Sequence, residues 1–412
     1  MRQPGHLLIL IGGHFANAPR PQKEAAVAVA TGFRVTVMGT WTDEGLSKED
    51  LSLAESLGVH FEPLLDLSQS SIKSLYSKFC SRIARLAYRR LGLILPESFG
   101  ASARMMLKEA RRVNPDLIMV HSEAGLWAGR KLLQQGYKVG VDFEDWFSED
   151  LPESARKARP VNGLKKLEHH LLHHAHLSVT TTKALSNALT QFSGCKRAPL
   201  TIPNTFPIVI SNDRTRDART TQAPVKFYWF SQTIGPGRGL EELAEALAQL
   251  TGSWELHLRG NLRHYADWYE ATFSAIPPNR IIVHPTVPNK NLSQASSSFD
   301  VGLALEDSQV RNRDLTATNK IFEYLRSRLA IIATNTKGQV EVMVQCPEAG
   351  IVITGSRLEE LVNALQFYID DRAALSLAKR AAFEAASTTW AWSRFAPQLA
   401  KSLESASRSS AC

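Results

Sequence analysis

Short apolar runs alternate with amphipathic stretches along the first half of the chain. Five runs have the length and composition of buried strands: Leu7–Gly12, Arg34–Met38, Asp116–Val120, Lys138–Asp142 and Ser178–Thr181. Apolar residues at helical spacing predict helices between them, at Glu24–Ala30, Glu123–Gln135, Leu164–His176 and Lys183–Gln191. Strands that alternate with helices of this length indicate a parallel sheet with helices on both faces.

The second half repeats this alternation. Its predicted strands are Lys226–Phe230, Glu255–Arg259, Arg280–Val283, Val301–Leu305 and Ala330–Ala333. Its predicted helices are Leu240–Leu250, Ala266–Ile276, Leu292–Ser297, a helix that begins at Asn319, and a last helical stretch, Arg372–Glu404. The polar stretch Ser211–Thr221 has no apolar periodicity and indicates a linker between the halves.

We therefore expect an α/β protein with two doubly wound, Rossmann-like parallel-sheet domains. The expected bounds are residues 1–205 for the N-terminal domain, 206–224 for the linker, 225–385 for the C-terminal domain and 386–412 for a C-terminal helix. A length of 412 residues suits two domains. Such folds bind ligands at the carboxyl ends of their strands, and we expect the ligands in the cleft between the two domains.

The composition indicates a cytoplasmic protein. The four cysteines, at positions 80, 195, 346 and 412, form no CxxC pair, which suits a reducing compartment. Leu7–Gly12 is too short for a signal peptide, and no apolar run reaches the roughly 20 residues of a membrane-spanning helix. We expect a soluble protein whose membrane association, if any, is peripheral and at the inner face.

The positive charge is concentrated in one segment. The chain has a net charge of +8, and Ser70–Val113 contains ten basic residues against two acidic ones. A charge that served only solubility would be spread along the chain. This segment therefore indicates an acidic partner or an anionic surface.

Within that segment, Ser70–Leu91 has the pattern of an amphipathic helix. One stripe at helical spacing is apolar: Ile72, Leu75, Tyr76, Phe79, Ile83 and Leu86. A second stripe is cationic: Lys78, Arg82, Arg85 and Arg89. The combination is typical of a helix lying on an anionic bilayer, and the predicted contact residues are Lys78, Phe79, Arg82, Ile83, Arg85 and Arg89.

Two other interpretations of this helix are open. The apolar stripe could pack on the first domain and leave the cations in solvent. Nucleic acid is disfavoured, because the aromatic residues of a base-stacking surface are not interleaved with these cations. We expect no nucleic-acid partner.

The segment Thr318–Leu325 has the features of a nucleotide diphosphate site. Thr318 is a helix-capping residue, and the free N–H groups at the helix start, together with Lys320, suit a phosphate. Glu323, one turn into the helix, suits a pair of sugar hydroxyls. In the turn Pro236–Gly239, the glycines allow close approach of a ligand and Arg238 can bind phosphate oxygens; a plain turn with a solvated arginine is equally open.

Polar residues also follow strands of the first half. Gly12 and Gly13 could approach a ligand closely, and His121 could orient or polarise a reacting hydroxyl, or be a structural histidine. Asp142 and Asp145 could bind hydroxyls or contribute base chemistry, although a helix-capping turn or, less favoured, a metal motif gives the same pattern. We interpret the histidines at 169, 170, 173, 174 and 176 as a helix surface rather than a zinc site.

These pieces, in this order, resemble the GT-B glycosyltransferases, particularly the retaining family 4 group that assembles polysaccharides and glycolipids. The resemblance covers nearly the whole chain and is most specific at the helix and the strand after Thr318. The matching segments are Asn114–His121, Thr180–Leu189 with Ile202–Asn204, Phe230–Leu240, Asn319–Leu325 with Ala330–Ala333, and Trp390–Trp392 with the final helix. By this resemblance the final helix crosses back to the first domain.

The resemblance implies transfer of a hexosyl group from a UDP- or GDP-sugar, with retained configuration, to a glycan or a lipid-linked acceptor. Glu323 would bind the ribose, Thr286 and Val287 would border the base, and His121 would face the reacting centre as a catalytic residue beside Glu323. The diphosphate would be held by Arg238 and Lys320, with Gly237 and Asn319 next to them. The acceptor would lie near Gly12, Gly13, Asp142 and Asp145. No metal or other cofactor is required, because cations and helix N-termini neutralise the leaving diphosphate.

The chain departs from the family pattern at two positions. Many members have a glutamate eight residues before the equivalent of Glu323, and Leu315 stands there. Gln232 stands where many have an arginine against the diphosphate. These departures keep a non-catalytic sugar-nucleotide-binding scaffold open as an alternative. A nucleotide-sugar epimerase of the same fold is a second alternative, which a membrane-binding helix disfavours.

Overall fold

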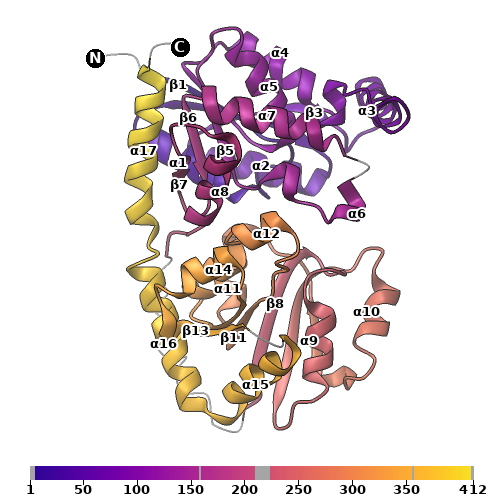
Figure 1. The fold of residues 1–412 in the computed structure, drawn as a ribbon, viewed down its shortest axis with the longest axis vertical. Helices are drawn as coiled ribbons and strands as arrows, with labels where there is room; N and C mark the ends of the chain where they lie inside the picture. The colour runs from indigo at the N-terminus through magenta and orange to yellow at the C-terminus, as the bar shows by residue number, and fades with distance from the viewer. Residues whose placement is uncertain (1–4, 157–158, 209–222, 355–356, 410–412) are drawn as a thin grey trace. The chain divides into compact units, whose positions relative to one another are not determined.

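The computed structural model of the protein describes residues 5–156, 159–208, 223–354 and 357–409 (Figure 1). The predicted linker segment Ser211–Thr221 lies outside these residues. The chain divides into two compact units, Met1–Pro203 with Phe395–Cys412 as unit 1, and Asn204–Arg394 as unit 2.

Unit 1 is built around a seven-stranded sheet, with every strand pair parallel. The strands are β1 (His6–Leu10), β2 (Arg34–Trp41), β3 (His60–Asp66), β4 (Leu117–Val120), β5 (Val139–Phe143), β6 (Leu177–Thr180) and β7 (Leu200–Thr201). Their order across the sheet is β3-β2-β1-β4-β5-β6-β7. Every residue of β1, β4, β5 and β6 is buried, as expected for parallel strands covered on both faces.

Several helices of unit 1 fall where the apolar spacing predicts them, whereas those at Glu44–Leu57, Ala103–Val113 and Glu153–Arg156 are not predicted from it. The helices of this unit are α1 (Pro19–Ala30), α2 (Glu44–Leu57), α3 (Ile72–Leu91), α4 (Ala103–Val113), α5 (Ser122–Leu133), α6 (Glu153–Arg156), α7 (Val161–His174) and α8 (Lys183–Ser193), with 3-10 turns η1 (Pro96–Ser98) and η2 (Phe147–Glu149). From Phe395 onward, α17 (Trp392–Arg408) belongs to this unit, and the Ser407 carbonyl accepts a hydrogen bond of 2.6 Å from Lys138 Nζ.

Unit 2 contains a six-stranded parallel sheet in the order β10-β9-β8-β11-β12-β13. Its strands are β8 (Val225–Thr233), β9 (Trp254–Asn261), β10 (Ile281–His284), β11 (Val301–Ala304), β12 (Ala330–Thr334) and β13 (Gly350–Ile353). Its helices are α9 (Leu240–Leu247), α10 (Ala266–Thr272), α11 (Asn289–Ser296), α12 (Arg311–Leu315), α13 (Asn319–Arg326), α14 (Lys337–Met343), α15 (Arg357–Asp370) and α16 (Arg372–Ser387), with 3-10 turns η4 (Pro278–Arg280) and η5 (Pro347–Ala349).

Both sheets reverse their strand order at one point, between β1 and β4 in unit 1 and between β8 and β11 in unit 2. The prediction of two doubly wound Rossmann-like domains is therefore confirmed. At such a reversal the loops that follow the two neighbouring strands diverge and leave room for a ligand. The loops after β1 and β4 contain Gly12 and His121, and the loop after β8 contains Arg238.

The last helical stretch is not continuous, and the prediction of one stretch over Arg372–Glu404 is wrong in its middle. α16 ends at Ser387, Thr388 leaves helical geometry with φ −121° and ψ −86°, and α17 begins at Trp392. Trp390, in the break, packs against Phe322 with ring centroids 5.5 Å apart. The Trp390 side chain is thus buried at the point where the helix is interrupted. None of the described helices is both long and apolar enough to cross a bilayer.

Candidate functional site

The loops at the β1–β4 reversal line a cavity of about 590 Å³ in unit 1. Gly12, Gly13 and His121 are among its lining residues, together with Asp145. A side chain on residue 12 would not fit, because its Cβ would lie 2.8 Å from the Cβ of Ser122. Four carboxylates line this cavity, those of Glu123, Glu144, Asp145 and Asp150, and Arg159, which also lines it, is paired with Glu123 and Asp150. Carboxylates accept hydrogen bonds from hydroxyls, so the lining suits a polyhydroxylated ligand.

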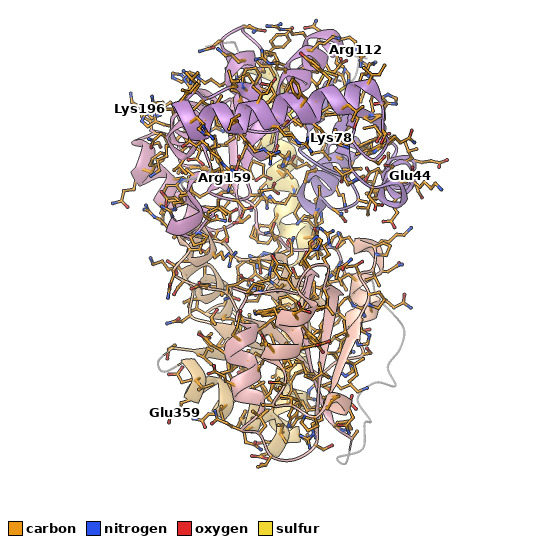
Figure 2. The ribbon with its side chains drawn as sticks, turned by 90° about the vertical axis from the view of Figure 1, so that its right-hand side faces the viewer. Glu44, Lys78, Arg112, Arg159, Lys196 and Glu359 are labelled. Atoms are coloured by element: carbon orange, nitrogen blue, oxygen red, sulfur yellow. The ribbon has the colours of Figure 1, made fainter. Side chains whose placement is uncertain are left out.

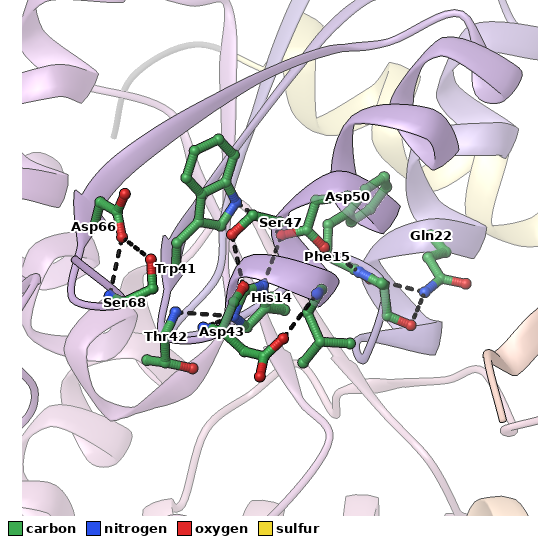
Figure 3. A network of polar contacts seen from close by, with 12 residues as sticks. His14, Phe15, Gln22, Trp41, Thr42, Asp43, Ser47, Asp50, Asp66 and Ser68 are labelled. Carbon is green, nitrogen blue, oxygen red and sulfur yellow. Dashed lines mark hydrogen bonds and ion pairs between the residues drawn. The ribbon is translucent and has the colours of Figure 1, made fainter. Parts of the chain in front are cut away.

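A buried hydrogen-bond network holds the β1 loop against the loop after β2 (Figure 3). His14 Nε2 accepts hydrogen bonds from the backbone N–H groups of Thr42 at 2.9 Å and Asp43 at 3.2 Å. His14 Nδ1 must then carry the proton, and it donates to Asp50 Oδ2 at 2.9 Å. Asp50 also accepts from the Trp41 indole at 2.9 Å and from the Ala16 backbone at 2.7 Å. His14 therefore fixes one wall of the cavity.

His121 follows β4 as the N-cap residue of α5 and is only 2% exposed. Its Nε2 lies 2.8 Å from Oε2 of Glu24, a buried residue of α1. Burial lowers the pKa of the imidazole, but the neighbouring Glu24 carboxylate outweighs this and raises the pKa of His121 to about 9. His121 Nδ1 has no hydrogen-bond partner among the described residues.

Asp142 is completely buried at the end of β5 and is not among the residues lining the cavity. Its Oδ2 accepts from Arg20 Nε at 2.6 Å, and Arg20 Nη1 donates to the Ile202 carbonyl at 2.8 Å. Burial raises the pKa of the Asp142 carboxyl, but the Arg20 charge dominates and holds it below its usual range. Glu144, two residues on, does line the cavity, and burial raises its pKa to about 7.

Ligand atoms of Glu24, His121 and Asp142 lie within 4.8 Å of one another, a spacing that a divalent ion could use. The charges of this group are already balanced. Arg20 is paired with Asp142, and His121 with Glu24. The donor set is therefore accounted for by two buried ion pairs.

In unit 2, three cationic side chains gather at the β8–β11 reversal. Arg238, in the turn after β8, donates to Ser231 Oγ at 3.0 Å. Arg313, on α12, donates to the carbonyl of Gly237 at 2.7 Å. Lys320 Nζ lies 2.7 Å from Glu306 Oε1, in the loop after β11. Burial, and then the charge of Arg313, lower the pKa of Arg238.

Neither Arg238 nor Arg313 has a carboxylate partner among the described residues, and each donates to a neutral oxygen. Two guanidinium groups that lie close together, neither in ion-pair contact with a carboxylate, suit an anion, although the charge of Glu306 also acts on Arg238. The turn that carries Arg238 requires glycine at position 239, because Gly239 has φ +75° and a Cβ there would lie 2.8 Å from the Cβ of Leu305. The Gly237 amide, in contrast, already donates to Glu241 at 3.2 Å.

The start of α13 is where the sequence predicts it, but its cap differs. Thr318 is the N-cap residue without a capping side-chain hydrogen bond, and its hydroxyl donates to Glu306 Oε1 at 3.3 Å. The Oδ1 atom of Asn319 is buried without a hydrogen-bond partner among the described residues. The first turn of α13 thus lies beside Glu306 and Lys320, next to the two arginines.

Glu323 is fully buried on α13. Its Oε2 accepts from Arg326 Nε at 2.9 Å and Nη2 at 2.6 Å, and its Oε1 accepts from Ser327 Oγ at 3.0 Å. Burial raises the pKa of this carboxyl, and the Arg326 charge opposes that rise. A ribose can reach Glu323 only after this side chain or its neighbours rearrange.

The residues predicted to border the base lie after the edge strand β10. Thr286 is exposed and Val287 is half-buried. The backbone that leads to them is fixed by Arg259, whose Nη1 donates to the Pro285 carbonyl at 2.8 Å.

The helix α3 lies on the face of unit 1 that Figure 2 presents, with Lys78 labelled. Its large apolar residues point to solvent: Ile72 is 87% exposed, and Leu75, Tyr76, Phe79, Ile83 and Leu86 are also exposed. Only the small residues Ser74 and Ala84 are buried. All six of its lysines and arginines are exposed, and the helix contains no acidic residue. The interpretation in which the apolar stripe packs on the first domain is therefore wrong.

The histidines of α7 stack on one another at helical spacing. His169 lies over His173, and His170 over His174, each with ring centroids 4.5 Å apart. Burial lowers the pKa of His170. The spacing is that of successive turns of one helix face, as the sequence indicates.

Several residues of both sites are not evident from the sequence. Arg20 and Glu24 are four residues apart on α1, so they lie on the same face of that helix. This spacing is the one feature of the sequence that could have indicated them as site residues. Arg313 and Glu306 carry no such signal, since Arg313 meets a turn 76 residues earlier in the chain.

No protein-family model and no curated protein sequence matches the chain. Solved structures match over nearly its full length. Sucrose-phosphate synthase from Thermosynechococcus elongatus is 14% identical with a TM-score of 0.70, and the match covers 97% of this chain and 98% of that chain.

Two further structures are similar. Anabaena Alr3699/HepE in complex with UDP-glucose is 16% identical with a TM-score of 0.70, covering 97% of this chain and 100% of that chain. A putative UDP-N-acetylglucosamine 2-epimerase from Listeria monocytogenes is 12% identical with a TM-score of 0.56, covering 95% and 96%. At these identities the similarity establishes the fold, and that fold is the GT-B arrangement of glycosyltransferases.

Proposed function

We propose that this protein is a retaining glycosyltransferase of the family 4 type. It moves a hexosyl group from a UDP- or GDP-sugar to a membrane-linked or polysaccharide-precursor acceptor. The bond between the anomeric carbon and the diphosphate oxygen breaks, a bond from that carbon to an acceptor hydroxyl oxygen forms, and the hydroxyl proton passes to the nucleoside diphosphate that leaves. The observation that carries the proposal is the pair of guanidinium groups without carboxylates, Arg238 and Arg313, at the β8–β11 reversal.

In this proposal the donor diphosphate binds Arg238, Arg313 and Lys320. Guanidinium groups bind phosphate oxygens bidentately, and their charge stabilises the diphosphate as it leaves. Arg313 supplies the second arginine that the sequence lacks at Gln232. The positive charge needed for departure therefore comes from side chains, and the proposed reaction requires no metal ion.

The same proposal assigns the ribose to Glu323 and the base to the neighbourhood of Thr286 and Val287. Glu323 Oε1 accepts one hydrogen bond in the structure, so it has a lone pair for a ribose hydroxyl once it is reached. The Anabaena HepE structures were obtained with UDP and with UDP-glucose, and UDP-sugars are therefore the first donors to test.

The carboxylate-lined cavity of unit 1 takes the acceptor in this proposal. Gly12, Gly13 and Asp145 line it. The glycines allow a sugar to approach closely, and the Asp145 carboxylate can accept a hydrogen bond from a sugar hydroxyl group. Asp142 has a supporting role in this proposal, because it lies outside the cavity lining and forms a buried ion pair with Arg20.

Product analysis separates this function from its alternatives. Purified protein is incubated with a panel of UDP- and GDP-sugars, with and without an extract of lipid-linked saccharides, and the products are resolved by mass spectrometry. A glycosyltransferase consumes a donor and lengthens an acceptor. A new nucleotide sugar formed without an acceptor would indicate the epimerase, which the Listeria neighbour keeps open. Tight nucleotide binding with no turnover across the panel would indicate the scaffold.

We also propose that α3 binds an anionic membrane surface. The helix presents large apolar residues and cations outward and turns only small residues inward, so its exposed face complements an anionic lipid interface. This surface would bring unit 1 to a lipid-linked acceptor at the inner face of the membrane.

Flotation with liposomes tests the membrane proposal. The wild type is expected to float with vesicles that contain anionic lipid, less so as salt rises, and not with neutral vesicles. The triple variant Arg82→Glu, Arg85→Glu, Arg89→Glu is expected to stay at the bottom of the gradient. A control triple variant at Lys48, Glu49 and Glu55 of α2, each changed to Gln, should float like the wild type. Equal flotation of the α3 variant and the wild type would refute the proposal.

A further inference from the structure

Four ionisable side chains meet beside the unit 1 cavity, and the proposed transfer gives no role to one of them, Glu24. Glu24 and Arg20 belong to α1, His121 follows β4, and Asp142 ends β5. All four are buried, with exposed fractions between 0% and 5%. Buried charges are costly unless they are paired, so an arrangement of this kind needs a reason in the chemistry next to it.

The pairs are specific. Glu24 is 2.8 Å from His121, and Arg20 is 2.6 Å from Asp142. The Arg20–Asp142 pair is anchored separately, since Arg20 also donates to the Ile202 carbonyl. Glu24 is therefore the carboxylate that faces the imidazole directly, while Asp142 is held by its own cation.

His121 has two ring nitrogens with different surroundings. Nε2 is held by Glu24, and Nδ1 has no hydrogen-bond partner among the described residues although it is buried. His121 is also one of the residues that line the cavity. A buried ring nitrogen without a partner costs free energy, so a polar ligand atom in the cavity would complete the hydrogen bonds of this ring.

We propose that Glu24 is a positioning residue that keeps His121 in its imidazolium form and orients it as a cationic hydrogen-bond donor toward the substrate. This inference rests on the proposed transferase and adds to it. With both ring nitrogens protonated, His121 cannot accept a proton from the acceptor hydroxyl at neutral pH. It binds an oxygen of the donor or acceptor and stabilises negative charge that develops there.

The charged groups around the ring favour this state. Glu24 faces it from α1, Asp142 and Glu144 from the end of β5 and the loop after it, and Arg20 from α1 beside Asp142. The raised pKa of His121, about 9, agrees with the geometry; burial also raises the pKa of the Glu24 carboxyl, and the His121 charge opposes that rise, so the two groups favour the ion pair only together. Removal of the Glu24 charge leaves an imidazole whose burial favours its neutral form.

The test is a titration of His121 by NMR in the protein without donor or acceptor. The His121 ring signal, assigned with His121→Asn, is expected to titrate near pH 9 in the wild type. In Glu24→Gln it should titrate below its ordinary value of 6.5, because the amide keeps the shape without the charge. Glu24→Asp should restore a raised pKa in part. Glu44→Gln, an exposed carboxylate on α2, is the matched control and should leave the titration unchanged.

The same variants distinguish this inference from the proposed function. If transfer is detected, its rate should fall above about pH 9 in the wild type, and Glu24→Gln should move that fall to lower pH. If no transfer is found but Glu24→Gln shifts the His121 titration, the function fails and the positioning role stands. A wild-type His121 that titrates at or below 6.5, or one that still titrates near 9 in Glu24→Gln, would overturn the inference.

Discussion

The most specific prediction concerns Arg313, which the structure adds to the proposed phosphate site. Arg313 is half-buried on α12, with Nη1 2.7 Å from the Gly237 carbonyl in the turn that carries Arg238. We expect Arg313→Gln to weaken binding of UDP or GDP. Glutamine can still donate to the Gly237 carbonyl, so the turn keeps a hydrogen bond while the site loses one positive charge.

The magnitude follows from the kind of contact. A hydrogen bond to a charged group contributes about 1.5–3 kcal/mol. Arg313 is partly open to solvent, which places its effect at the lower end of this range, and 1.4 kcal/mol corresponds to about tenfold in Kd. We therefore expect a loss of about tenfold, somewhat smaller for Arg313→Lys, which keeps the charge but loses the planar fork.

Isothermal titration calorimetry with the nucleoside diphosphate at low and high salt measures this effect. Arg311→Gln is the matched control, since Arg311 lies two residues away on the same short helix and is exposed. The difference between the two variants should shrink as salt rises, because exposed charges are screened. Equal affinities of Arg313→Gln, Arg311→Gln and the wild type would refute the reasoning.

Three other predictions follow from particular contacts. Glu306→Gln removes the carboxylate 2.7 Å from Lys320 and should tighten UDP or GDP binding by up to about tenfold in calorimetry; weaker binding would show that Glu306 holds the site together. The pKa of His121 is raised to about 9, so its pair with Glu24 contributes stability that is complete below pH 6.5 and is lost as pH rises through about 9. The difference in the free energy of unfolding between wild type and Glu24→Gln, measured by urea titration, should therefore fall across that window. A constant difference would contradict this prediction. Gly39→Ala should destabilise unit 1 by about 1–3 kcal/mol in urea, since its Cβ would lie 2.4 Å from the Gly13 carbonyl oxygen, whereas Gly13→Ala meets nothing within 4 Å and should be near neutral; equal stabilities would contradict this packing.

The sequence predicts the fold well because its signals are local. Buried parallel strands are continuous apolar runs, and the amphipathic helices between them have clear spacing, so nearly every strand that precedes a site residue was placed within a few positions. Residues that follow strands of the same sheet, such as Gly12 and His121 in unit 1, then share one edge of that sheet by topology alone, and Arg238 takes the equivalent place in unit 2. The break at Thr388 was missed because it depends on Trp390 packing on Phe322, a contact between distant segments.

Partners of site residues could not be predicted, because they are set by tertiary contacts between side chains far apart in the chain. Glu24 meets His121 across 97 positions, and Arg20 meets Asp142 across 122. Glu323 is marked by its motif, yet its ion pair with Arg326 and its burial are visible only in the structure. The outward orientation of the apolar stripe of α3 likewise depends on which face of the helix packs on unit 1.

The central claim is that unit 2 binds the diphosphate of a sugar-nucleotide donor through Arg238 and Arg313. The most direct measurement is a calorimetric titration of UDP, GDP and their sugars into the wild type and into the double variant Arg238→Gln, Arg313→Gln. The account predicts that at least one of these ligands binds the wild type at one site, and that the double variant loses this binding while unfolding at the wild-type temperature. Absence of binding by every ligand, or unchanged binding in the folded double variant, would contradict it.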